Sequence, residues 1–216
     1  MEELDLKALW QSYNHKLDHS IRLNQELLME AKMTKVRRLL SAVRPVRIFA
    51  VITGIIWVLF LYLVLKVAWH ADNYFLLVSA GIHTLVIHIL LVISIFHLFL
   101  IYDMRQSEFV LKTQKQLAQF RQSTLLGIRL SALQMPVFTT FYLSEGFLIN
   151  GGPIMWTVHA ALFISFAAVG IWAFRNFVPA NRDKKWFQFI VGDRETEALD
   201  KAEDLLDQIG EWEENV

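Results

Sequence analysis

YFLLVSAGIHTLVIHILLVISIFHLFLIY, the stretch from Tyr74 to Tyr102, contains no Lys, Arg, Asp or Glu. At 1.5 Å per residue, a helix of this length exceeds the roughly 30 Å of a bilayer core, so it predicts a slightly tilted transmembrane helix. The stretch also holds three histidines, His83, His88 and His97. Because polar groups in lipid are costly without partners, these histidines pose the first functional question.

The composition indicates an integral membrane protein. Of the 216 residues, 55% are hydrophobic and 19% are charged, compared with about 45–50% and about 25% in soluble domains. A net charge of zero gives no field that favours nucleic acid, and the absence of cysteine excludes disulfides, thiolate metal sites and cysteine nucleophiles. The opening residues do not predict a cleaved signal peptide.

Apolar segments predict an all-α fold, an integral membrane four-helix bundle with amphipathic cytoplasmic helices at both termini. The third predicted span is the most polar, and we expect Pro136 to kink it. In the fourth, Ala161, Ser165 and Ala168 share a face that predicts close approach of another helix. We expect three units: a cytoplasmic helix and basic flank over 1–47, a membrane domain over 48–178, and an acidic cytoplasmic tail over 179–216. Within the membrane domain, the predicted spans are about 48–68, 74–102, 130–149 and 155–177, and a helical cytoplasmic loop covers 103–129.

The distribution of basic residues predicts the orientation. Of the 21 Lys and Arg residues, all but Lys66 fall in the terminal regions, the 103–129 loop or the adjoining inner ends of the spans. By the positive-inside rule, we expect a multi-pass protein of the inner (cytoplasmic) membrane with both termini in the cytoplasm.

The segment before the first span predicts a long amphipathic helix with an apolar stripe. Its members recur at alternating spacings of four and three, and Leu9, Ile21 and Leu28 widen the stripe. We expect Trp10, Tyr13 and Leu17 to bind a partner, which is a second copy, another part of this chain or a cytoplasmic protein. The acidic C-terminal helix is a candidate mate within the chain. The stripe comprises Leu6, Trp10, Tyr13, Leu17, Ser20, Asn24, Leu27 and Ala31.

The histidines allow two cofactor hypotheses beside a structural role in hydrogen bonding. His83 and His97 lie fourteen residues apart and share a helix face with Ser79 and Ser94, which we expect to point into the bundle because unpaired polar groups are costly in lipid. The two histidines resemble half of a b-type haem site, in which His159 would be the axial partner of His83. Alternatively, a divalent metal or a proton relay could use an outer cluster. We expect hydrogen bonding to be the main role. The residues of that outer cluster are His70, Asp72, His83, Glu145 and His159.

The order of the parts also carries a resemblance. A Trp-containing helix, LWQSYNHKLDHSIRLNQELL (Leu9 to Leu28), precedes a small helical membrane domain. This layout resembles bacterial four-span inner-membrane proteins and, more loosely, membrane-bound anti-sigma regulators, which hold a sigma factor with N-terminal helices. The resemblance implies a non-enzymatic, oligomeric scaffold or regulator acting through its cytoplasmic helices. The alternative is a haem- or ion-binding redox or transport component built on the intramembrane histidines.

Overall fold

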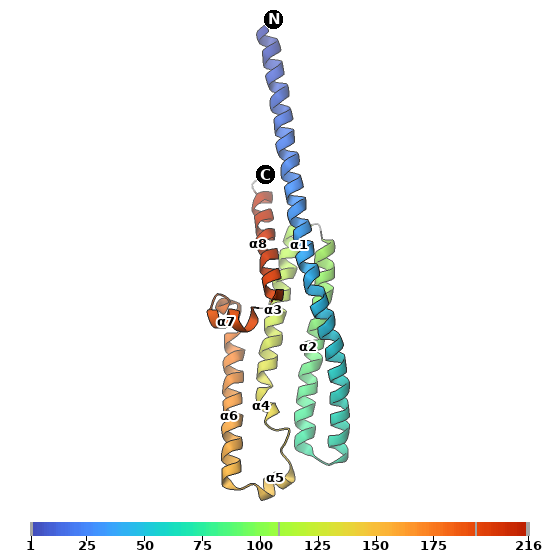
Figure 1. Cartoon of the computed structure of the whole chain (residues 1–216), viewed down its shortest axis with the longest axis vertical. Helices are drawn as coiled ribbons and strands as arrows, with labels where there is room; N and C mark the ends of the chain where they lie inside the picture. The colour runs from blue at the N-terminus through green and yellow to red at the C-terminus, as the bar shows by residue number, and fades with distance from the viewer. Residues whose placement is uncertain (1, 108, 193, 215–216) are drawn as a thin grey trace.

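The computed structural model describes residues 2–107, 109–192 and 194–214, and these residues contain helices and no strand. Three helices are long and apolar enough to cross a membrane: α1 (Glu2–His70), α2 (Tyr74–Gln106) and α6 (Pro153–Asn176). The molecule is an elongated bundle from which the N-terminal part of α1 projects, and both chain ends lie toward the same end (Figure 1).

Helix α1 is one continuous helix of 69 residues, with Pro45 inside it. Pro45 removes one backbone donor, yet the helix continues from the projecting segment into the apolar one. At the far end, Asp72 takes a left-handed conformation with φ of 49° and the chain reverses. Asn73 then caps α2, because its side chain accepts the Leu76 N–H at 3.1 Å.

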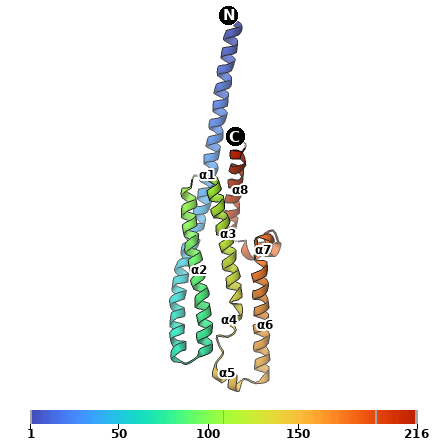
Figure 2. The ribbon, with the colours of Figure 1, turned by 180° about the vertical axis from the view of Figure 1, so that it is seen from behind.

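The third predicted span, 130–149, is not a single helix. Helix α3 (Val110–Leu133) ends before Pro136, and the short helices α4 (Met135–Phe138) and α5 (Glu145–Asn150) follow, separated by an irregular segment over 139–144. The expectation of a kinked but continuous helix is therefore wrong. The broken segment descends beside α6, which returns toward the end that carries the termini (Figure 2).

Helices α3 and α6 cross closely at small residues. A Cβ on Gly170 would lie 2.6 Å from the backbone oxygen of Ala132, and Ala173 of the same face is buried. The predicted small-residue face, Ala161, Ser165 and Ala168, is instead exposed. The motif type was right for α6, but the contact lies on a different face.

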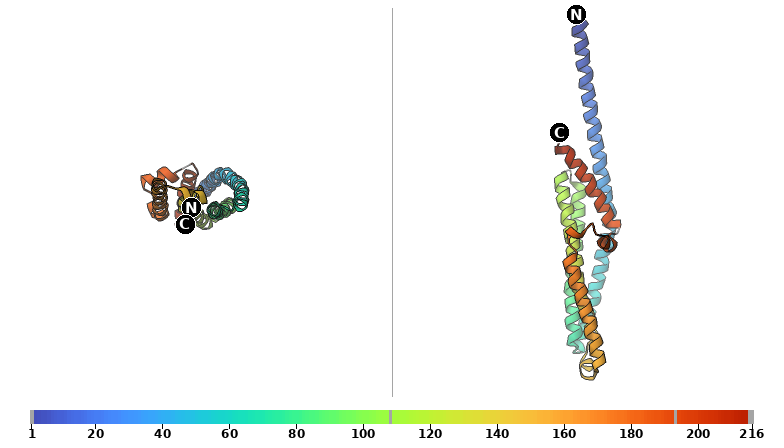
Figure 3. Two further views of the ribbon diagram at one scale, coloured as in Figure 1. Left: turned by 90° about the horizontal axis from the view of Figure 1, so that it is seen from below. Right: turned by 90° about the vertical axis from the view of Figure 1, so that its left-hand side faces the viewer.

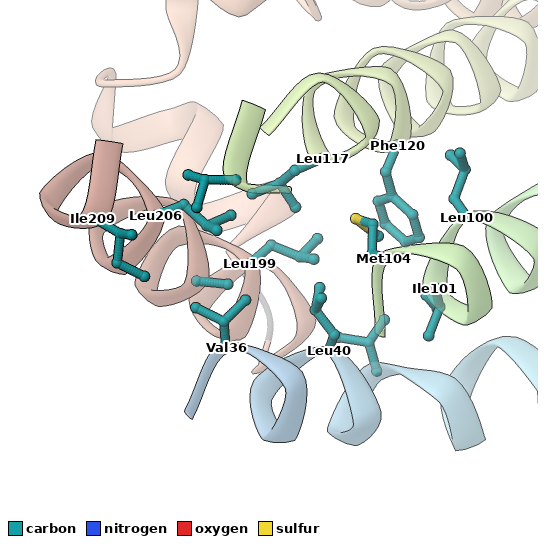
Figure 4. Packing of buried hydrophobic residues seen from close by; sticks show 13 residues of the cluster. Val36, Leu40, Leu100, Ile101, Met104, Leu117, Phe120, Leu199, Leu206 and Ile209 are labelled. Atoms are coloured by element: carbon teal, nitrogen blue, oxygen red, sulfur yellow. The ribbon is translucent and has the colours of Figure 1, made fainter. Parts of the chain in front are cut away.

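After α6, the chain forms a short 3₁₀ turn (Pro179–Asn181), α7 (Lys185–Val191) and α8 (Arg194–Glu214). Helix α8 rises beside α1 and α3, as the side view in Figure 3 shows. There the four helices α1, α2, α3 and α8 enclose the main apolar core, which we call the head (Figure 4). Its buried members are Val36, Leu40, Val43, Leu100, Ile101, Met104, Val110, Leu117, Phe120, Leu199, Ala202, Leu206 and Ile209.

Candidate functional site

His83 lies at the centre of the hydrogen bonds that hold the membrane part together. Trp57 of α1 donates its indole N–H to His83 Nε2 at 3.1 Å. Nδ1 therefore carries the ring proton and donates it to Gln134 Oε1 at 2.9 Å. His83 and Gln134 are both buried, so a neutral imidazole with both nitrogens satisfied ties α1 and α2 to the end of α3.

A second polar contact pins the broken segment to α2. The hydroxyls of Ser79 and Thr140 lie 2.7 Å apart, and Ser79 is buried. Non-helical backbone at membrane depth is tolerated only where it is buried in protein or lines a cavity. Ser79 and His83, on the predicted polar face of α2, thus hold Gln134 and the segment that follows it against the bundle.

The other two histidines of α2 also have partners on neighbouring helices. His97 is fully buried in the head, where Nε2 lies 2.7 Å from Ser123 Oγ and its ring stacks on Phe120 with centroids 4.0 Å apart. His88 donates from Nδ1 to Thr84 O, and its Nε2 lies 3.3 Å from the hydroxyl of Tyr62 on α1. The prediction that His83 and His97 face the interior is confirmed.

The five residues predicted as an outer metal cluster are not brought together. His70, Asp72 and Glu145 are exposed, and His70 donates to the backbone oxygen of Lys66 in its own helix. Glu145 is the first residue of α5 and follows the capping residue Ser144. Over the described ranges, no group of three or more His, Asp or Glu residues is placed to hold a metal ion.

The predicted haem pair of His83 and His159 has ring nitrogens that are engaged in hydrogen bonds. Haem iron needs a free imidazole nitrogen from each axial histidine, and both nitrogens of His83 are occupied by Trp57 and Gln134. His159 lies elsewhere in an aromatic group, with Nδ1 2.7 Å from the Tyr142 hydroxyl. Sequence reasoning missed these partners, although Trp57, Gln134 and Tyr142 were visible as polar groups inside predicted spans.

The predicted partner-binding residues lie on a long exposed part of α1 that precedes its apolar segment. Trp10, Tyr13 and Leu17 are 66%, 67% and 58% exposed. Every residue from 9 to 28 is exposed, over about 30 Å of helix at 1.5 Å per residue. Leu6 belongs to the same pattern, but its side chain lies outside the part that the structure describes. We call residues 9–28 the projecting segment.

Helix α8 covers the part of α1 that follows the projecting segment. Its acidic side chains form ion pairs with arginines of α1, of α3 and of the segment before α7. Arg47 of α1 donates from Nε to Glu195 Oε1 at 2.8 Å, and Asp200 accepts from Arg121 of α3 at 2.6 Å and from Arg182 at 2.5 Å. The prediction that the acidic tail packs on α1 holds at the basic flank and not at the stripe.

The same ion pairs keep Arg182, in the connector between the 3₁₀ turn and α7, positively charged. Burial alone would lower the pKa of Arg182, but the carboxylates of Asp200 and Glu203 outweigh burial and raise that pKa above its ordinary value. Arg182 therefore stays charged and fixes the connector to α8. These ion pairs hold α8 in the head, so α8 does not also cover the projecting segment.

Comparison of the chain with protein-family models, with curated proteins and with solved structures gives no match. Function is therefore inferred from the geometry of this chain. Buried polar side chains such as His83, Gln134 and Ser79 hold the apolar helices together. The projecting segment, in contrast, presents an apolar surface with nothing packed on it among the described residues.

Proposed function

We propose that this chain is a non-enzymatic scaffold of the inner membrane that assembles with copies of itself through the projecting segment of α1. The observation that carries the proposal is the exposure of every residue from 9 to 28 on a helix that has no packing partner there among the described residues. Isolated helices are marginal in water, and most helices gain their stability from an apolar face packed on another surface.

The pattern of the stripe supports a second copy as that surface. With Trp10, Leu17 and Asn24 at the a positions of heptads, Tyr13, Ser20 and Leu27 occupy the d positions. A single Asn at an a position is a known device for fixing the register of a two-stranded parallel coiled coil, at some cost in stability. Leu9, Ile21, Leu23 and Leu28 extend the apolar surface on both sides.

Membrane insertion supports the parallel arrangement. Two copies that cross one bilayer in the same direction present their α1 helices on the same side and with the same polarity. The stripe also points away from the chain's own head. At 100° per residue, its mean direction lies about 160° from that of Met29, Met33, Val36 and Leu40, which pack into the head. A second copy can therefore approach without displacing α8.

The bundle is proposed to cross the membrane four times, with both termini in the cytoplasm. Helices α2 and α6 run in the same direction along the bundle, and the segment of α3, α4 and α5 between them runs in the opposite direction (Figure 1). If α2 and α6 both cross the bilayer, the chain must therefore cross once more between them. The contacts of His83 with Gln134 and of Ser79 with Thr140 supply the polar groups that a broken crossing requires.

Single cysteines test the self-assembly, because the natural chain has none. Leu17→Cys lies on the stripe, and His15→Cys, which is also exposed, lies about 160° away around α1. In oxidised membranes, we expect Leu17→Cys to form a disulfide-linked dimer rapidly and His15→Cys to form one at least about tenfold more slowly. Equal rates at both positions, or no dimer at either, would overturn self-assembly and leave the stripe to a cytoplasmic protein.

A second set of cysteines tests the four crossings. We expect a membrane-impermeant maleimide to label Ala71→Cys and Asn150→Cys in intact cells, and Lys115→Cys only after the membrane is permeabilised. All three positions are exposed in the structure. Labelling of Asn150→Cys and Lys115→Cys from the same side would show that the segment between them does not cross.

A further inference from the structure

A small cavity lies where α1 and α2 emerge from the apolar part of the bundle. It has a volume of about 290 Å³, and three of its lining residues are arginines. Arg37 and Arg44 are seven residues apart on α1, which places them within about 20° of the same face, and Arg105 comes from the last turn of α2. The full lining is Arg37, Arg44, Tyr102, Arg105 and Gln106.

No carboxylate in the described ranges forms an ion pair with any of these three arginines. Asp103, in the same turn of α2 as Arg105, is bound by Lys112 and Gln116 of α3. The arginines of the head behave differently, since Arg47 and Arg121 each meet acidic side chains of α8. The cavity thus concentrates positive charge that no carboxylate of the described residues pairs with.

Arg37 has unused donor capacity in this cavity. Its Nη2 donates to the backbone oxygen of Ser107 at 3.3 Å. Its Nε is buried and has no hydrogen-bond partner among the described residues. An unpaired buried donor costs free energy, and a phosphate oxygen is the acceptor that the forked guanidinium group binds best.

The position of the cavity along α2 indicates the source of such an oxygen. Tyr102 ends the charge-free stretch that begins at Tyr74, and tyrosine is enriched at the level of lipid headgroups. Basic pockets between helices at this level bind anionic headgroups. This argument requires that α2 crosses the bilayer, but it does not depend on self-assembly, because the stripe occupies a different face of α1.

We propose that the cavity lined by Arg37, Arg44 and Arg105 binds an anionic phosphate group. An anionic phospholipid such as phosphatidylglycerol presents this group at the level of the cavity, and free phosphate presents the same chemistry from solution. The bound group would connect α1 to α2 where the projecting part of α1 leaves the membrane domain.

Native mass spectrometry of the full chain in detergent tests the proposal. We expect the first phosphatidylglycerol to bind about tenfold more tightly than the first phosphatidylcholine, as one charge-assisted contact would give. Arg44→Gln should remove this preference. Arg44 makes no hydrogen bond or ion pair in the described part of the chain, so the substitution leaves the fold intact, which thermal unfolding checks. Arg37→Gln is expected to have the same effect on binding.

Arg175→Gln is the matched control, because Arg175 is an exposed arginine near the same end of the bundle, in the last turn of α6. It should keep the lipid preference within about twofold, whereas a general attraction between charges would weaken alike in both variants. Binding of inorganic phosphate that also displaces phosphatidylglycerol would identify the free ion as the source, and failure to bind or displace would identify the lipid. Equal affinity for the two lipids without phosphate binding, or equal losses in Arg44→Gln and Arg175→Gln, would overturn the proposal.

Discussion

The two parts of α1 that precede its apolar span carry apolar side chains at helical spacing, but only the second is covered. Val36 and Leu40 are each 1% exposed in the head, whereas Trp10 and Leu17 remain more than half exposed. Both parts belong to one uninterrupted helix. The comparison therefore isolates the effect of a packing partner from the effect of helical propensity.

The covered part differs in having an acidic helix opposite a basic flank. Arg47 donates to Glu195, and Leu199, Leu206 and Ile209 of α8 belong to the core that α8 forms with α1 and α3. The projecting segment lies beyond the reach of α8, and its stripe faces away from the head. An apolar periodicity thus shows which face of a helix must be buried, whereas charge complementarity shows which element of the same chain can bury it.

The largest effect on this comparison should come from Phe120→Ala. Phe120 is fully buried, stacks on His97 and lies 5.0 Å below the Arg47 guanidinium. Its loss leaves a cavity in the head and should lower the free energy of unfolding by about 3–5 kcal/mol. Thermal unfolding in detergent, followed by circular dichroism, measures the change. A loss below about 1 kcal/mol would mean that the head is loosely packed.

Leu40→Ala should weaken the covered part of α1 by about 2–4 kcal/mol, because Leu40 packs inside the head. Limited proteolysis should then cut first in α8 or in the residues of α1 beside it. Val46→Ala is the control, since Val46 is a nearby apolar residue of α1 that is 50% exposed. Similar losses in both variants would show that α1 is not held through this face.

Glu195→Gln should have a smaller effect, about 2 kcal/mol, because it keeps the shape of the side chain but removes the charge that binds Arg47. Asp204→Asn, on the exposed face of α8, should change stability by less than about 0.5 kcal/mol. Chemical unfolding of both variants in the same detergent gives the comparison. If the two losses are equal, the acidic character of α8 acts only through its overall charge.

The sequence predicted the parts of the fold that depend on composition. Lack of charge identified α2, and the shared face of Ser79, His83 and His97 correctly indicated the interior. The break after Leu133 was not predicted, because a proline within a span fits a kink as well as an interruption. What decides between them is whether partners such as Ser79 can satisfy the irregular backbone, and that depends on tertiary contacts.

The part of the candidate site that could be predicted from the sequence consists of the exposed residues of the stripe, which have no packing partner among the described residues. Trp10, Tyr13 and Leu17 belong to a predicted stripe that no other described residue covers. The five residues of the metal hypothesis are not brought together among the described residues. The positions of polar residues along a span also do not show which nitrogen is already engaged, as both are in His83. The arginine cavity was visible in sequence only as a basic run, since Arg105 joins Arg37 and Arg44 through folding.

The smallest effect on the single chain should come from Leu17→Ala, and this small effect is informative. Leu17 is 58% exposed, so in a dilute, monomeric sample its truncation should change the free energy of unfolding by less than about 0.5 kcal/mol. At concentrations where copies associate, the same substitution should weaken assembly by about 1–2 kcal/mol, because each copy then loses apolar area buried at the stripe. Analytical ultracentrifugation in density-matched detergent measures the association, with His15→Ala as the control on the opposite face. If Leu17→Ala destabilised the monomer as much as Leu40→Ala does, the projecting segment would have a partner within its own chain, and the contrast between the two parts of α1 would disappear.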